Sequence, residues 1–95
     1  MIKISIKKDN IKIEGHSGYS EYGSDIVCAS VSSIAITSIN SILKYDEKAL
    51  EYDKKDGYLE VKILKHDEII DMLIDNMIEL LKDLENQYKK YVKLI

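Results

Sequence analysis

Cys28, the sole cysteine, and His16 are the residues of this chain best suited to chemistry. Ser24 and Asp25 are good helix-capping residues, so Cys28 is expected in the first turn of a helix, where backbone N–H groups and the helix dipole favour a thiolate. An imidazole within hydrogen-bond reach can take the thiol proton, and the sulfur can then attack a peptide carbonyl. The pair predicts nucleophilic catalysis, with backbone N–H groups near Cys28 as the expected oxyanion donors.

Residue type and spacing leave structural roles open for the same two side chains. A lone cysteine on an apolar helix is commonly a small buried hydrophobe, and a lone histidine is commonly structural or exposed. The second histidine, His66, has no recognisable metal-ligand spacing and is expected on the surface beside a helix. With two histidines and one cysteine, we expect neither a metal centre nor a cofactor.

The first half of the chain predicts two strands, a loop and a helix. Isoleucines alternate with polar residues over 2–7 and 11–14, which is the pattern of a half-buried hairpin. The segment 17–24 is rich in Gly, Ser and Tyr and predicts a flexible loop that can bring His16 to the helix.

No charged residue occurs in 26–43, a stretch close to the length of a membrane span. Its seven Ser, Thr and Asn side chains indicate a helix packed within protein instead. Apolar positions spread widely around this helix, so either a second copy of the chain or the core of one subunit is expected to cover them.

The second half predicts strands at 49–52 and 58–64, a turn between them, and a helix from Asp67 with apolar spacings of three and four up to Tyr91. The element order is ββαββα. This order predicts an α+β fold, with an antiparallel four-stranded sheet and two helices packed on one face, in a single domain covering residues 1–95.

The composition of the chain limits the classes of partner and the compartment that we expect. The 14 basic residues, all lysines, are outnumbered by 17 acidic ones, which gives a net charge of −3 and argues against direct nucleic-acid binding. Such a surface would suit a basic protein partner. One cysteine excludes an intramolecular disulfide, and the first residues lack the features of a secretory signal, so we expect a cytoplasmic protein without a membrane anchor.

Three sequence features together resemble a known signature: the pair Gly15-His16, the run YGSDIVCA at 22–29, and Ser32. They are similar to those of the ribosomal-processing cysteine protease family, Prp, and the length and element order fit the family from end to end. The resemblance implies a homodimeric endopeptidase. Its expected substrate is the N-terminal segment of a large-subunit ribosomal protein, from which it removes an extension by cutting after an aromatic residue.

The resemblance places the nucleophile at Cys28 and the catalytic histidine at His16. Asp25 and Ser32 also match family positions and are expected to support the pair. Asp25 either orients His16 or caps the helix, and we favour capping. Gly23 is expected to supply a backbone conformation closed to other residues.

The loop departs from the family pattern, because Ser17 and Gly18 replace the commoner small residue and acidic neighbours after the histidine. Gly18, Tyr19 and Tyr22 are expected to form a substrate-binding loop. The two tyrosines either line a pocket for the substrate's aromatic residues or anchor the loop, and anchoring is favoured for Tyr22. We expect substrate to order this loop.

Two functions of other classes compete with catalysis. The first is a non-catalytic, ribosome-associated protein-binding module, in which Cys28 is buried and inert. The second is a structural dimerisation domain, in which Ile36 and Ile39 matter and Cys28 does not.

Overall fold

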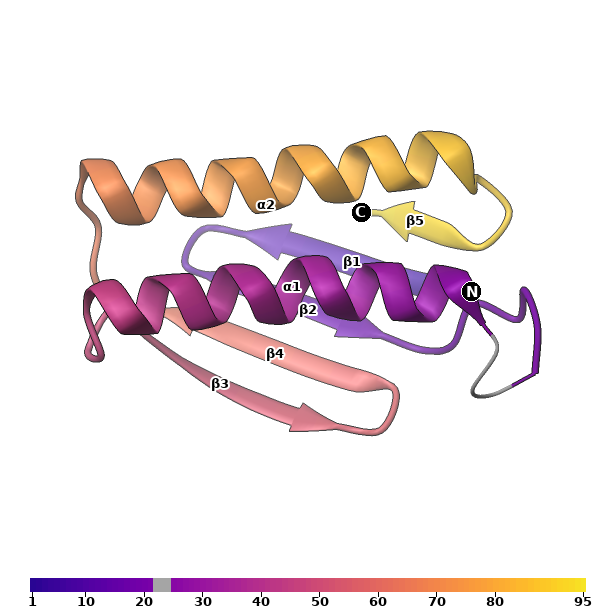
Figure 1. Ribbon diagram of the computed structural model, residues 1–95, viewed down its shortest axis with the longest axis horizontal. Helices are drawn as coiled ribbons and strands as arrows, with labels where there is room; N and C mark the ends of the chain where they lie inside the picture. Colours follow the sequence, from indigo (N-terminus) through magenta and orange to yellow (C-terminus); the bar gives the residue numbers. More distant parts are fainter. Residues whose placement is uncertain (22–24) are drawn as a thin grey trace.

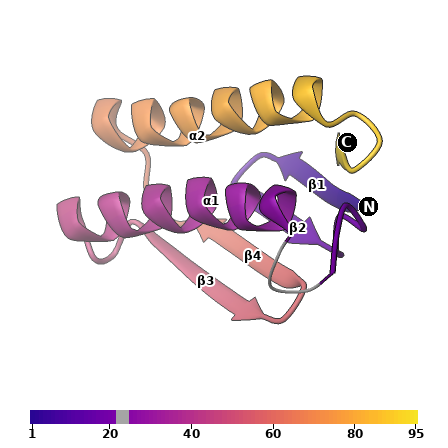
Figure 2. The ribbon, with the colours of Figure 1, turned by 45° about the vertical axis from the view of Figure 1, so that its right-hand side comes forward.

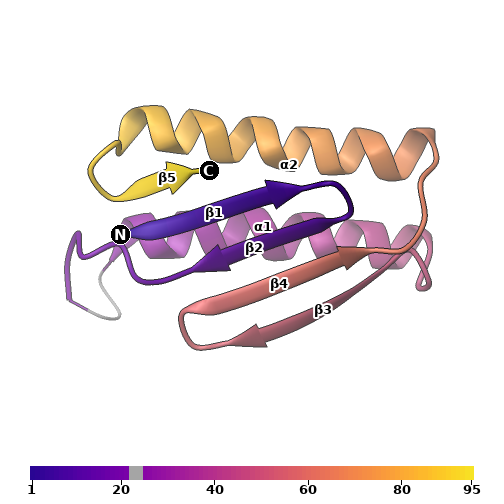
Figure 3. The same ribbon diagram turned by 180° about the vertical axis from the view of Figure 1, so that it is seen from behind.

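The computed structural model describes residues 1–21 and 25–95 of the chain. The elements follow in the order β1 (Ile2–Lys7), β2 (Asn10–Glu14), α1 (Ile26–Tyr45), β3 (Leu50–Lys55), β4 (Tyr58–Ile63), α2 (Glu68–Gln87) and β5 (Val92–Leu94). The strands form one sheet in the order β3-β4-β2-β1-β5. Both helices lie on one face of this sheet, as the front and back views show (Figure 1, Figure 3).

The sheet is mixed. β1 pairs antiparallel with β2, β2 with β4, and β4 with β3, whereas β5 runs parallel to β1. The predicted α+β class and the two helices on one face are confirmed. The predicted four antiparallel strands and the ββαββα order are wrong, because a fifth strand follows α2.

The error lies in the last eight residues. Tyr88 and Tyr91 continue the helical spacing, but α2 ends at Gln87, and the backbone N–H of Tyr88 donates to the carbonyl oxygens of Leu84 and Glu85. β1 would otherwise present an unpaired edge, and Val92–Leu94 pairs with it while Val92 is only 1% exposed. A strand of three residues is too short to show a periodic pattern, and its pairing with a strand at the other end of the sequence cannot be read locally.

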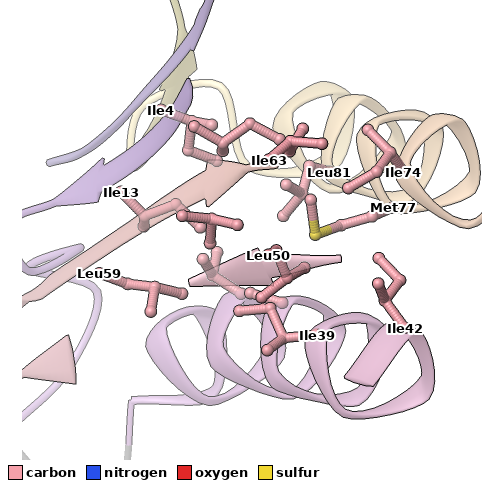
Figure 4. Close-up of a cluster of buried hydrophobic side chains, with 14 of the residues drawn as sticks. Ile4, Ile13, Ile39, Ile42, Leu50, Leu59, Ile63, Ile74, Met77 and Leu81 are labelled. Carbon is pink, nitrogen blue, oxygen red and sulfur yellow. The ribbon is translucent and has the colours of Figure 1, made fainter. Parts of the chain in front are cut away.

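The core lies between the sheet and the helix layer. Alternation along the strands turns every second side chain toward the helices, and the side chains at these positions are mostly apolar. Figure 4 shows this cluster, in which side chains of β1, β2, β3 and β4 meet those of α1 and α2. Its labelled members are Ile4, Ile13, Ile39, Ile42, Leu50, Leu59, Ile63, Ile74, Met77 and Leu81.

α1 is a core helix. Five of its side chains are buried, and Ile34, Ile36 and Leu43 pack against the same cluster while remaining partly exposed. The buried ones are Val27, Val31, Ala35, Ile39 and Ile42. Within the described part of the chain, α1 alone is long and apolar enough by length and composition to cross a membrane. The five buried side chains lie in the core, so one side of the helix is covered within this chain.

Candidate active site

Three segments meet at one end of the molecule: the end of β2, the start of α1 and the turn between β3 and β4 (Figure 2). β2 pairs with β4, and the backbone N–H of Gly15 donates to the carbonyl oxygen of Gly57 at 2.8 Å. Residues far apart in the sequence therefore face one another at this end.

Cys28 lies in the first turn of α1, as predicted, and is partly exposed. Its backbone N–H donates to Asp25 Oδ1 at 2.9 Å, and its Sγ accepts the backbone N–H of Ser17 at 3.3 Å. The sulfur thus lies at the positive end of the helix, within reach of the segment that follows His16.

Asp25 is the N-cap of α1, in agreement with the favoured prediction. Its Oδ1 accepts the backbone N–H groups of Val27 and Cys28, and its Oδ2 accepts the hydroxyl of Ser17. Burial alone would raise the pKa of the Asp25 carboxyl. Hydrogen bonds from the Ser17 hydroxyl and from the N–H groups of Cys28, Ser20 and Val27 outweigh that effect and lower the pKa to about 2. The cap is therefore a carboxylate at neutral pH.

The backbone N–H groups at the start of α1 are candidates for the predicted oxyanion donors. The N–H groups of Val27 and Cys28 are bonded to the Asp25 side chain, and that of Ala29 to the Asp25 carbonyl oxygen. All three are engaged in the cap and the first helical turn. The expected oxyanion donors of the helix start are therefore occupied in this conformation.

His16 follows Gly15, whose φ of +99° and close approach to Met1 exclude a side chain, because a Cβ there would be 2.5 Å from the Met1 carbonyl oxygen. The imidazole of His16 lies over the β3–β4 turn. A Cβ placed on Gly57 would be 2.8 Å from His16 Nε2. The glycine at the turn thus makes room for the ring, which is exposed to solvent.

A groove with a volume of about 860 Å³ runs between α1 and the β3–β4 turn. His16, Asp25, Cys28 and Ser32 all contribute to its lining, so the structure brings these four predicted residues together. The lining also contains apolar side chains from the sheet and α1, including Ile2, Ile13, Val31, Ala35, Ile36 and Leu59.

The predicted substrate-binding loop is only partly described. Tyr19 packs edge-to-face on Tyr88 at 5.8 Å and on Tyr91 at 5.2 Å between ring centroids, so it anchors this segment to the α2–β5 connection. Among the described residues, the groove lining includes neither Gly18 nor Tyr19. The predictions for Tyr22 and Gly23 lie outside the described residues.

Two residues of the site were not predicted from the sequence. Gly57 falls within the predicted turn between 52 and 58, and the pairing of β4 with β2 that carries it to His16 has no local signal in the sequence. In the sequence Ser17 is only a departure from the family pattern, whereas in the structure it is buried and contacts both Asp25 and Cys28. A polar residue directly after the histidine was the one available hint.

His66 lies on the surface just before α2, as expected, beside residues of the β1–β2 turn and not in the lining of the groove. Its ring is held between Asp71, 2.6 Å from Nδ1, and Asp9, which contacts Nε2. The hydrogen bond to Asp71 and, to a smaller extent, the one to Asp9 raise the pKa of His66. Within residues 1–21 and 25–95, no group of three or more His, Cys, Asp or Glu side chains is placed to hold a metal ion.

Comparison with known proteins identifies the family. The model of the family described as cysteine protease Prp matches residues 1–93. The ribosomal processing cysteine protease Prp of Staphylococcus aureus (strain NCTC 8325 / PS 47) is 26% identical over 91 residues, which are 93% of this chain and 86% of that protein.

Solved structures share the fold. The essential ribosomal processing protease Prp from S. aureus in complex with a covalently linked product peptide superposes with a TM-score of 0.87 at 22% identity, covering 98% of this chain and 94% of that one. Its complex with a substrate peptide gives a TM-score of 0.82 at 21% identity, with coverages of 99% and 95%. Because the family model matches nearly the whole sequence, this chain belongs to the cysteine protease Prp family.

Proposed function

We propose that this cysteine protease removes the N-terminal extension of a large-subunit ribosomal protein, with Cys28 as the nucleophile and His16 as the general base. The observation that carries the proposal is that both side chains line one solvent-open groove, with the Cys28 sulfur in the first turn of α1. A reactive thiol needs access to substrate, a nearby base and a positive electrostatic setting.

The reaction proceeds in two halves. His16 takes the thiol proton of Cys28, the sulfur adds to the scissile carbonyl carbon, and the imidazolium then protonates the departing amine as the C–N bond breaks. This leaves a thioester on Cys28. In the second half, His16 removes a proton from water, the hydroxide adds to the thioester carbonyl, and the sulfur leaves with the proton returned to it.

The groove suits an extended peptide with apolar side chains. Its floor is formed by isoleucine, valine, alanine and leucine side chains from the sheet and α1, whereas Lys54, Lys55 and Asp56 form a polar rim on the hairpin. Apolar floors with few polar groups are typical of peptide and ligand sites. An aromatic residue before the cleaved bond would bury its ring on that floor.

The relatives support the same substrate class. The S. aureus protease has been solved with a substrate peptide and with a covalently linked product peptide, and its name states ribosomal processing. A covalent link to product is what a thiol nucleophile would form. We extend this activity to the present chain as a proposal.

We further propose a homodimer that acts in the cytoplasm and binds neither nucleic acid nor membrane. The net charge of −3 favours approach of a basic ribosomal protein rather than of RNA. The sole cysteine is a free thiol, and a nucleophilic thiol must stay reduced, which suits a reducing compartment.

Cleavage of a matched peptide tests the proposal. A peptide copying the N-terminus of the host's ribosomal protein is incubated with wild type, Cys28→Ala and His16→Ala, and products are measured by mass spectrometry. His66→Ala is the control for loss of a histidine outside the groove. We expect cleavage by wild type and His66→Ala, and at least a hundredfold loss in the other two. Equal cleavage by Cys28→Ala would contradict the assignment of the nucleophile.

A further inference from the structure

Ser17 makes three hydrogen bonds around the proposed nucleophile, although it is not one of the reacting groups. Its hydroxyl donates to Asp25 Oδ2 and accepts the backbone N–H of Tyr19 at 3.0 Å. Its own backbone N–H donates to the Cys28 sulfur at 3.3 Å. The side chain is only 3% exposed, so water is largely excluded from these contacts.

One carboxylate joins this serine to the catalytic helix. Oδ1 of Asp25 holds the N–H groups of Val27 and Cys28, while Oδ2 holds the Ser17 hydroxyl. The backbone that carries His16 and the helix turn that carries Cys28 are therefore fixed to the same group. Without the hydroxyl, Ser17 itself would be linked to the helix start by the weaker N–H to sulfur contact, while the N–H of Ser20 would still bind Asp25 three residues further on.

We propose that Ser17 is a positioning residue of this protease: its hydroxyl binds the Asp25 cap and thereby holds the Ser17 backbone N–H on the Cys28 sulfur and the neighbouring His16 at the groove. This inference rests on the proposed roles of Cys28 and His16. Catalysis requires the nucleophile and the base to be aligned, and the Ser17 side chain would maintain that alignment.

The backbone N–H at position 17 has a direct electrostatic role. The N–H groups of Val27, Cys28 and Ala29 are engaged by Asp25, whereas that of Ser17 points at the sulfur. An N–H donor binds negative sulfur more strongly than neutral thiol. When the sulfur adds to a carbonyl, the negative charge moves from the sulfur to the carbonyl oxygen, two bonds away. We propose that the N–H of Ser17 can then donate a hydrogen bond to that oxygen.

The test compares Ser17→Ala with Ser30→Ala. Ser30 is the matched control, because its hydroxyl also makes a hydrogen bond near the start of α1, to the carbonyl oxygen of Ile26 at 2.6 Å. The hydrogen bonds of the described residues that hold Asp25 and Cys28 do not involve this hydroxyl. Three quantities are measured for each protein: kcat and KM on the peptide, the rate of Cys28 alkylation by iodoacetamide at pH 7.5, and the urea midpoint of unfolding.

We expect Ser17→Ala to lower kcat and the alkylation rate by about tenfold with KM changed less than twofold, because alignment rather than substrate binding is lost. Ser30→Ala should keep both rates within twofold of wild type. Ser17→Thr, which retains the hydroxyl, should recover most of the kcat lost in Ser17→Ala. The kcat of Asp25→Asn and that of the double variant Ser17→Ala/Asp25→Asn should differ by much less than tenfold, since each substitution breaks the same Ser17–Asp25 contact.

The inference is overturned if Ser17→Ala retains wild-type kcat and alkylation, or if it and Asp25→Asn act additively. It is also overturned if the loss of rate merely follows a fraction of unfolded protein seen in the urea curve. Alkylation needs no substrate, so it separates the two proposals. A wild type that cleaves nothing while Ser17→Ala slows alkylation contradicts the proposed function and leaves the role of Ser17 standing.

Discussion

Replacing Gly57 by alanine perturbs the site through a single methyl group. Gly57 is in the turn between β3 and β4 with a φ of +67°, and His16 lies against it. A Cβ at this position would be 2.8 Å from Nε2, 3.2 Å from Cε1 and 3.4 Å from Cδ2 of His16. The first distance is too short for van der Waals contact, so the imidazole must move away from the turn.

The substitution is expected to lower both the stability of the protein and its activity. A left-handed conformation costs a non-glycine residue about 1 to 2 kcal/mol, which lowers the melting temperature of a domain of this size by roughly 4 to 16 °C. The ring is exposed and can move cheaply, so the contact itself adds little to that loss. Activity is affected more, because displacing a catalytic group by about 1 Å can cost on the order of a hundredfold. We expect kcat/KM to fall by about 10- to 100-fold.

The assay measures kcat/KM on the peptide at 25 °C together with thermal unfolding. Gly57→Asn is the matched variant, because asparagine tolerates positive φ better than alanine but carries the same Cβ. It should be more stable than Gly57→Ala and equally impaired in cleavage. The reasoning is refuted if Gly57→Asn cleaves like wild type, or if activity in both variants follows stability alone.

Three further outcomes follow from the described contacts. Asp25→Asn should destabilise the protein at neutral pH by up to about 1 kcal/mol, because the negative charge at the positive end of α1 and its charge-assisted hydrogen bond from Ser17 are lost. Since the lowered pKa of Asp25 stabilises the fold above about pH 4 and that contribution is lost as pH falls toward 2, the difference in melting temperature between the two proteins should shrink in acid. His66→Ala should show the opposite trend: the raised pKa of His66 stabilises the fold below its usual value of 6.5, and the difference should disappear as pH rises through the raised pKa. Tyr19→Ala should lower the free energy of unfolding in urea by about 1 kcal/mol through loss of two edge-to-face contacts, whereas Tyr19→Phe keeps both.

Much of the fold could be predicted because local patterns and packing agree. The alternating isoleucines of β1 and β2, the uncharged stretch 26–43 of α1 and the amphipathic α2 each carry a signal within their own residues. Sheet order is different, since β2 pairs not only with its hairpin partner β1 but also with β4, which is distant in sequence. β5 was missed for the same reason: its three residues gain their conformation from the edge of β1.

In the candidate site, too, the residues placed by local sequence could be predicted, and those placed by distant contacts could not. Cys28 and Asp25 were predictable because the capping sequence sets their place on α1, and the structure finds both there. Their meeting with His16 in one groove depends on how the end of β2, the helix start and the β3–β4 turn come together. The contributions of Gly57 and Ser17 emerge only from that assembly, as does the contact of Tyr19 with two tyrosines near the C-terminal strand.

The central claim is that His16 activates the Cys28 sulfur, and the rate of Cys28 alkylation tests it most directly. Wild type, His16→Ala and the control His66→Ala are treated with iodoacetamide at pH 7.5, and the modified fraction is followed by intact-protein mass spectrometry. The account predicts that wild type and His66→Ala react faster than a cysteine in an unfolded peptide, and that His16→Ala reacts at least tenfold more slowly than wild type. Equal rates for wild type and His16→Ala would contradict it.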